Sequence, residues 1–152
     1  MSNKYDSTND TVQHIAHVRS FIAEIIFALQ KASIEHDKSK LQEPEKSIFD
    51  TATPKLSALT YGSDEYRAAL SELKPALEHH YAVNSHHPEH YKLGIFGMTL
   101  IDLIEMYCDW RAAVLRHDDG DFAESLQINK ERFGIDNQLA AIFENTRLYL
   151  GW

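Results

Sequence analysis

The histidines of this chain are concentrated in one short stretch, and acidic residues are spaced so that they could converge on it. Five of the nine histidines lie between His79 and His90, and a His36-Asp37 pair lies upstream. Three acidic residues follow in an apolar segment: Asp102, Glu105 and Asp109. Histidine is the commonest metal-binding side chain and the one whose charge changes most readily near neutral pH. This combination predicts a metal-dependent enzyme.

The three acidic residues are expected on one helical face, because Asp102, Glu105 and Asp109 are spaced by three and then four positions. Their neighbours are almost all apolar, so the helix is expected to be buried. A buried carboxylate is costly unless it is paired or bound to a metal. The alternative is pairing with Arg19, Arg111 or a lysine. For Asp102 the two interpretations stand equal, whereas Glu105 and Asp109 together favour a functional site.

The His36-Asp37 pair is expected where a helix ends. Adjacent residues cannot share a helical face, but they can share a metal where the backbone turns. His17 is a further candidate ligand, although one straight helix would separate it from His36 by ~28 Å at 1.5 Å per residue. A turn near Ala32-Ser33 is needed to bring His36 back towards it. Contact with substrate or a place in the core are the alternatives for His17.

The histidine run is expected to span a helix end and the loop after it. His80 belongs to the last turns of a long helix, and His86 and His87 lie in a loop stiffened by the following proline. Loops on rigid scaffolds often carry functional residues. The alternative is an exposed loop that is rich in histidine by accident, and this is the favoured interpretation for His79 and His90.

Helical periodicity dominates the chain, and no segment alternates as a strand does. Residues 1–10 read as a flexible tail, and residues 11–152 as a single compact all-α domain of about six to seven helices. A turn-rich segment is expected at 51–62, a loop at 85–97 and a turn at 117–120. Glycines at 134 and 151 are expected to stop the last two helices. The helices are expected at 11–31, 43–49, 64–83 with a bend at Pro75, 98–116, 122–133 and 136–150.

The composition of the chain restricts the kinds of molecule that it is expected to bind. The formal net charge is −8 and no basic stripe is present, so polymeric DNA or RNA is not expected to bind. A small anionic substrate remains compatible, because a bound cation reverses the local field. The single cysteine, Cys108, excludes an internal disulfide, fits a reducing cytoplasm and is expected to be a buried thiol. No apolar run approaches ~20 residues, so no signal peptide or membrane span is expected. Aromatic residues near the end of the sequence leave a homo-oligomer open.

Three motifs in order resemble the HD-domain superfamily of metal-dependent phosphohydrolases, over about residues 14 to 115. The similarity is greatest to a branch of small HD-like proteins common in bacteriophages. That branch has a His-Asp-x-Ser-Lys motif followed by Glu, then His-x3-Asn-x-His-His, then Glu-Met-x-x-Asp-Trp. This chain supplies His36-Asp37-Lys38-Ser39-Lys40 and Glu45, His80 with Asn84 and His86-His87, and Glu105-Met106-Tyr107-Cys108-Asp109-Trp110.

The resemblance implies a role for each matched residue. His17, His36, Asp37 and Asp109 would form the first metal site. Asp37 could also bridge to a second metal held by His80 and by His86 or His87. The short gap between His17 and His36 and the additional carboxylates Asp102 and Glu105 depart from the better-known branches, which leaves the ligand list and the metal number open.

The expected reaction is hydrolysis of a nucleotide or a related small phosphoester by a metal-activated water. One or two divalent ions (Mn, Fe, Co, Ni, Zn or Mg) are the expected cofactor. The protein is expected in the cytoplasm, which is the host cell's cytoplasm if the chain is phage-encoded. Catalytic roles are assigned to Asp37, Glu45, Glu105 and Lys40, and substrate contacts to Lys38, Asn84 and His86.

Two other functions are compatible with the same residues. The domain could bind a nucleotide or a protein without turnover and keep the metal as a structural element. It could also be a carboxylate-rich helical nucleotide pyrophosphohydrolase, although that activity needs acidic motifs on two helices, and only the Asp102-Glu105-Asp109 helix is a good candidate.

Overall fold

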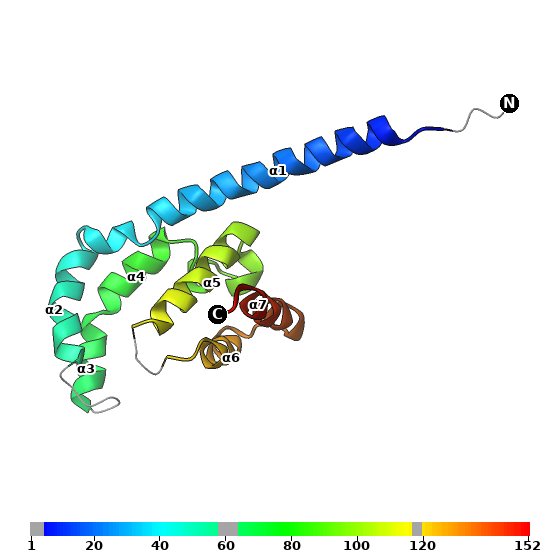
Figure 1. Ribbon diagram of the computed structural model, residues 1–152. Coiled ribbons are helices and arrows are strands. Elements are labelled where there is room, and N and C mark those ends of the chain that lie inside the picture. The colour runs from blue at the N-terminus through cyan, green and yellow to red at the C-terminus, as the bar shows by residue number, and fades with distance from the viewer. Residues whose placement is uncertain (1–4, 58–63, 117–119) are drawn as a thin grey trace.

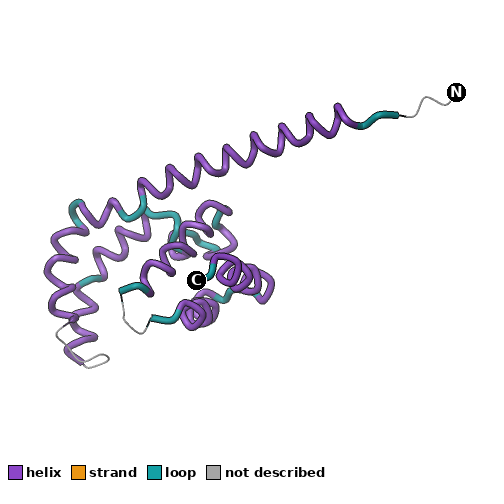
Figure 2. Tube along the Cα trace, viewed as in Figure 1, coloured by secondary structure: helices purple, strands orange, loops and turns teal. Residues whose placement is uncertain are grey.

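The computed structural model describes residues 5–57, 64–116 and 120–152, and within these ranges it contains helices and no strands (Figure 2). The predicted all-α class is therefore confirmed. The α-helices are α1 (Thr8–Glu35), α2 (Glu45–Ser57), α3 (Asp64–Glu72), α4 (Lys74–Val83), α5 (Leu100–Val114), α6 (Phe122–Phe133) and α7 (Asn137–Leu150). Short 3₁₀ helices lie between them: η1 (Lys38–Leu41), η2 (Pro88–His90) and η3 (Gly94–Gly97).

Two groups of helices flank the end of a long first helix. Figure 1 shows α2, α3 and α4 together on one side and α5, α6 and α7 on the other. The C-terminal part of α1 packs against α5, whereas its N-terminal part projects away from both groups (Figure 1). Residues near the end of α1 therefore lie where the two groups meet.

Helix α1 is longer than the sequence indicated, because it runs unbroken from Thr8 to Glu35. The expected turn at Ala32-Ser33 is wrong. Neither residue breaks a helix, and the Ser33 hydroxyl donates to the carbonyl oxygen of Gln30 within the helix (2.8 Å). The helix also takes in positions 8–10, which the sequence assigned to a flexible tail.

The middle helices follow the expected pattern with one extension. The long segment at 64–83 is divided at Leu73, and Pro75 lies in the first turn of α4, where a missing N–H costs nothing. Helix α2 continues through Pro54 to Ser57, so the turn expected from position 51 is wrong as far as 57. Ala52 is 1% exposed, and its burial favours the helix over local turn preference. Residues 58–63 lie outside the described part of the chain.

The last three helices begin and end on recognisable caps. The Thr99 hydroxyl accepts from the Asp102 amide, and the Asp102 carboxylate accepts in return from the Thr99 amide. Asp121 and Asp136 cap α6 and α7. Both helices stop at glycines in the left-handed conformation, at positions 134 and 151, as expected. The turn expected at 117–120 falls largely on 117–119, outside the described residues.

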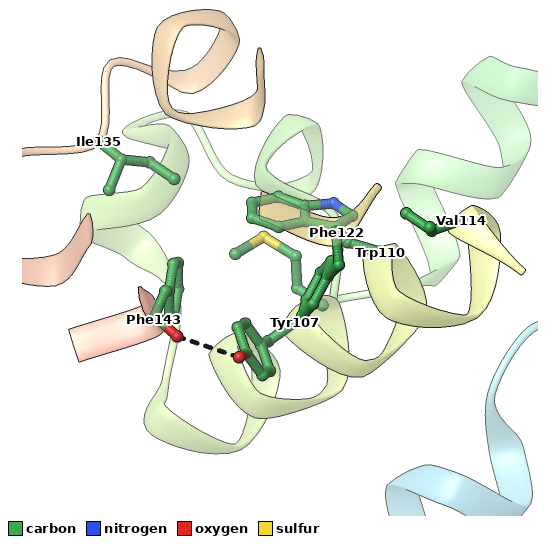
Figure 3. Close-up of a cluster of buried hydrophobic side chains, with 7 residues drawn as sticks. Tyr107, Trp110, Val114, Phe122, Ile135 and Phe143 are labelled. Atoms are coloured by element: carbon green, nitrogen blue, oxygen red, sulfur yellow. Dashed lines mark hydrogen bonds between the residues drawn. The ribbon is translucent and has the colours of Figure 1, made fainter. Parts of the chain in front are cut away.

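The hydrophobic core lies between α5, α6 and α7 (Figure 3). The Tyr107 hydroxyl donates to the backbone oxygen of Phe143 (3.0 Å), and Trp152 stacks on the Tyr107 ring. Trp152 and Phe143 thus pack inward, whereas Tyr149 is exposed. The buried members are Met106, Tyr107, Trp110, Val114, Phe122, Ile135 and Phe143.

Candidate metal centre

His36 and Asp37 lie where α1 ends, as the sequence indicated. His36 is the C-cap residue, and Asp37 has a left-handed backbone with φ of 55°. Aspartate tolerates this conformation better than most residues other than glycine. The turn lets both side chains face the space between α4 and α5, although they are adjacent in sequence.

Histidines from α4 and the loop after it face the same carboxylate. The Nε2 atoms of His80 and His86 lie 3.3 and 3.6 Å from Asp37 Oδ1. His87 Nε2 lies 2.9 Å from His80 Nε2. His80 and His86 are 1% and 2% exposed, so the reading of the run as an exposed loop is wrong for these members.

Two glutamates hold the opposite nitrogens of these rings. Glu45 Oε2 lies 3.0 Å from Nδ1 of His80. Glu105 Oε1 lies 3.0 Å from Nδ1 of His86 and 2.9 Å from Nδ1 of His36. A carboxylate on one ring nitrogen fixes the tautomer and orients the other nitrogen as a metal ligand. The Nε2 atoms of all three histidines are therefore turned towards Asp37.

Two buried atoms at the centre have no hydrogen-bond partner among the described residues: Asp37 Oδ1 and His86 Nε2. Leaving such atoms unpaired costs about 1–3 kcal/mol each. Ligand atoms bound at ~2.0–2.2 Å to one cation lie ~3–3.5 Å from each other. The separations around Asp37 Oδ1 fall in or near this range. The buried group Asp37, His80, His86 and His87 could therefore hold a metal ion.

A second group uses the other side of Asp37. His36 Nε2 lies 3.7 Å from Asp37 Oδ2 and 3.6 Å from Asp109 Oδ1. His36, Asp37 and Asp109 are also close enough to share a cation. Lys40 Nζ lies against Asp37 Oδ2 at 2.6 Å. One oxygen of Asp37 thus faces the buried histidines, while the other is paired with a lysine.

Neighbouring charges and burial shift the pKa values of several groups in the cluster. The carboxylates of Asp109 and Glu105 raise the pKa of His36 to about 10. Burial opposes ionisation of Asp37, but the nearby His80 and the Lys40 ammonium outweigh it and hold its pKa below the ordinary value. Burial and the neighbouring His86 and His80 lower the pKa of His87 to about 3. A neutral His87 is the form that can bind a metal.

Three of the expected catalytic or substrate-binding residues make contacts inside the cluster. Glu45 was expected to be catalytic, but it is 0% exposed and accepts from the Ser39 hydroxyl (3.0 Å) besides contacting two histidines. Asn84 was expected to bind substrate, but its amide donates to Ser39 Oγ and to the His80 carbonyl oxygen (both 2.8 Å). Glu105 is similarly engaged by two rings. All three side chains thus contact the histidines, and their catalytic and substrate-binding roles stay predictions.

The remaining candidates lie at the edge of the cluster or away from it. Lys38 pairs with Glu35 (2.9 Å) and lines a cleft of about 570 Å³. The structure does not bring His17 to the site, because α1 is straight between it and His36. His79 contacts Glu45 (2.7 Å), so it belongs to the surrounding network, whereas His90 bonds the Tyr81 carbonyl oxygen.

Asp102 and Cys108 both differ from what the sequence predicted for α5. Asp102 accepts from Ser85 (2.6 Å) and Tyr91 (2.8 Å) in addition to its capping role, and it does not join the groups near Asp37. The acidic helix thus presents two carboxylates to the cluster instead of three. Cys108 is exposed, contrary to expectation, because its side of α5 lines a second cleft of about 380 Å³ against α1.

Sequence reasoning assigned no role to Ser39, whose hydroxyl joins Glu45, His80 and Asn84. The signal was present, since Ser39 is part of the His-Asp-x-Ser-Lys motif. Its role depends on contacts between segments more than forty positions apart in two of the three cases.

Residues 3–149 match the model of a family described as a family of unknown function (DUF5662), and the chain belongs to that family. No curated protein and no solved structure matches the chain.

Proposed function

We propose that this protein is a metal-dependent phosphohydrolase of the HD type that acts on a small phosphoester such as a nucleotide. The observation that carries the proposal is the convergence of histidine nitrogens on Asp37, with two buried atoms left unpartnered. Structural ion-pair networks satisfy their members, whereas a metal site without its ion leaves ligand atoms unpaired. The order of the three sequence motifs supports the same class.

The donor set favours a divalent transition metal. Three imidazoles and one carboxylate suit Mn, Fe, Co, Ni or Zn, and Mg is the alternative where oxygen ligands dominate. We place the first ion among Asp37, His80, His86 and His87, because this group is the more buried and contains the unpartnered atoms. A second ion would use His36 and Asp109, with Asp37 shared. This order reverses the one inferred from sequence.

A bound divalent cation supplies an activated water and polarises a phosphoryl oxygen. The chain's own residues then bind and orient the substrate. Lys40 is one-third exposed and projects beside Asp37, so its ammonium group can contact a phosphate oxygen. Lys31 and Lys38 line the larger cleft, which has room for the remainder of a nucleotide. Glu105 and Glu45 keep the imidazoles oriented throughout.

The test is phosphate release from a panel of nucleoside mono-, di- and triphosphates and cyclic esters, with Mn²⁺, Co²⁺ or Mg²⁺. His36→Ala is expected to abolish turnover. His90→Ala removes a histidine from the same run but outside the cluster, and it should leave turnover unchanged. Release that persists unchanged in His36→Ala would refute the proposal. Stoichiometric nucleotide binding without product would instead indicate the non-catalytic alternative.

A further inference from the structure

Helix α1 carries an unusual amount of exposed apolar surface. No residue of this helix is buried, although it is 28 residues long. Single exposed apolar residues are normal on a protein surface, whereas a continuous apolar patch along a helix marks an interaction site. The large apolar side chains exposed on it are Val12, Ile15, Val18, Phe21, Ile22, Ile25, Ile26, Phe27 and Ile34.

The apolar residues follow a heptad spacing that continues into the folded body. Steps of three and four positions connect Ile15, Val18, Ile22, Ile25, Leu29, Ala32 and His36, which we call the α1 seam. Its C-terminal members, Leu29 and Ala32, face Ile104 and Cys108 of α5 across the second cleft. The N-terminal members continue the same face beyond α5, with no apolar cover from the described residues.

This helix is a poor candidate to stand alone. Ile and Val lose side-chain freedom in a helix and are weaker helix formers than Ala or Leu. Most helical stability in proteins comes from packing an apolar face. The projecting half of α1, rich in Ile and Val, therefore requires a partner surface in order to be helical.

We propose that the partner is a second copy of this chain, with the two α1 seams packed against each other in an antiparallel pair. The exposed apolar side chains on the seam and directly beside it amount to roughly 500 Å² on one α1, taking ~150 Å² for a large side chain and leaving out Phe27 and Ile34, which lie opposite the seam. Interfaces are only about 56–65% apolar. A stable interface buries ~800 Å² per partner. Isoleucine and valine occupy the four seam positions that α5 leaves free, and one symmetric contact covers both exposed faces at once.

The distribution of polar residues separates a helical pair from a membrane. By length and composition α1 could cross a bilayer. However, a membrane-spanning helix is apolar on all sides, whereas the side of α1 opposite the seam carries five polar residues beside the apolar Phe27 and Ile34: Gln13, His17, Ser20, Glu24 and Lys31. Surface-bound amphipathic helices carry many cations, but this chain has a net charge of −8. Both comparisons favour a protein partner.

The position of α5 decides the direction of the pair. A parallel, in-register partner would place its own α1 along the seam at Leu29 and Ala32, where α5 already lies. In an antiparallel pair centred near residue 20, the seam residues that face each other are those that α5 leaves free. It sets Ile15 opposite Ile25 of the partner copy and Val18 opposite Ile22 of the partner copy, with the two bodies at opposite ends.

The first test is the mass of the full-length protein in solution, measured by light scattering across micromolar concentrations. The wild type is expected at twice its chain mass of 17.4 kDa. Ile22→Glu places a charge in the seam and should yield a monomer. Ser20→Glu adds the same charge on the opposite face and should remain dimeric. Unchanged tryptophan fluorescence from the α5 core shows that each variant keeps its body folded.

A monomeric wild type, or an Ile22→Glu variant that stays dimeric, would overturn the proposal. So would co-flotation of the wild type with phosphatidylcholine vesicles, with or without phosphatidylglycerol. Direction is read from spin labels at Gln13 and Lys31 in a Cys108→Ser background. The antiparallel pair gives a Lys31 distance longer than the Gln13 distance by roughly 10 Å, from 1.5 Å per residue. Equal distances would show a parallel pair and refute the antiparallel arrangement.

Discussion

The two sides of helix α5 are stabilised in opposite ways. One side presents Tyr107 and Trp110 to an aromatic core, where burial of apolar area is itself favourable. The other side presents Glu105 and Asp109 to a cluster of imidazoles and carboxylates. Burial there is unfavourable unless every group is paired. Helix α5 therefore connects the aromatic core, whose burial stabilises the fold, to the polar cluster, whose burial costs stability unless its groups are paired.

The contrast indicates which atoms could bind a cation. Packing in the core is completed by the chain itself, with Trp152 stacked on Tyr107 and the Tyr107 hydroxyl satisfied by Phe143. In the cluster, the outer nitrogens are satisfied by Glu45 and Glu105, whereas the inner Asp37 Oδ1 is not. A cation at the centre of the cluster would satisfy Asp37 Oδ1, as Phe143 satisfies the Tyr107 hydroxyl in the aromatic core.

The largest effect is expected from Asp37→Asn, which removes the charge on which the imidazoles converge. Turnover should fall by ~10³-fold or more, equivalent to ~4 kcal/mol of transition-state stabilisation. The aromatic core should be unaffected, so near-ultraviolet circular dichroism should match the wild type. Phosphate release under saturating metal measures the effect. Wild-type turnover in this variant would mean that the cluster is not the reacting centre.

Trp110→Ala removes a buried side chain from the aromatic core, on the side of α5 away from the cluster. Truncation of this buried ring should lower the free energy of unfolding by about 3–5 kcal/mol. Metal affinity of the fraction that remains folded should not change, because the cluster lies on the opposite face. Urea unfolding and metal titration measure the two quantities. Weakened metal binding in the folded variant would show that the two regions are coupled.

Glu105→Gln and Asp102→Asn form a matched pair one turn apart on α5. Loss of the Glu105 charge should lower metal affinity by about 10–100-fold, because two imidazoles lose their orienting carboxylate. Asp102→Asn should cost about 1–2 kcal/mol of stability through the weakened cap and leave metal affinity unchanged. Calorimetric titration distinguishes them, and equal losses of affinity would contradict the assigned positions.

The smallest effect concerns pH in the metal-free protein. The pKa of His36 is raised from its ordinary value of about 6.5 to about 10. Its contribution to stability is therefore fully present below pH ~6.5 and is lost as the pH rises through about 10. The difference in Tm between wild type and His36→Gln should shrink over that range. A difference that grows with pH would contradict the pairing of His36 with Asp109 and Glu105.

The sequence was most informative where local chemistry decides the structure. Helix stops at glycines 134 and 151, and the placement of His36 and Asp37 at a helix end, could be expected from local patterns. The roles of Glu45 and Glu105 could not, because Glu45 contacts histidines 34 and 35 positions away and Glu105 contacts His36, 69 positions away. Helical spacing likewise grouped Asp102 with Glu105, while its capping role turned it to Thr99.

The left-handed backbone at Asp37 also restricts how this protein can vary. Only glycine, asparagine and aspartate adopt that conformation at low cost, and of these only aspartate provides a charge. Glutamate would keep the charge but strain the turn, and glycine would keep the turn but remove the carboxylate. A protein engineer who wishes to empty the centre while preserving the fold is therefore left with asparagine as the closest replacement in shape.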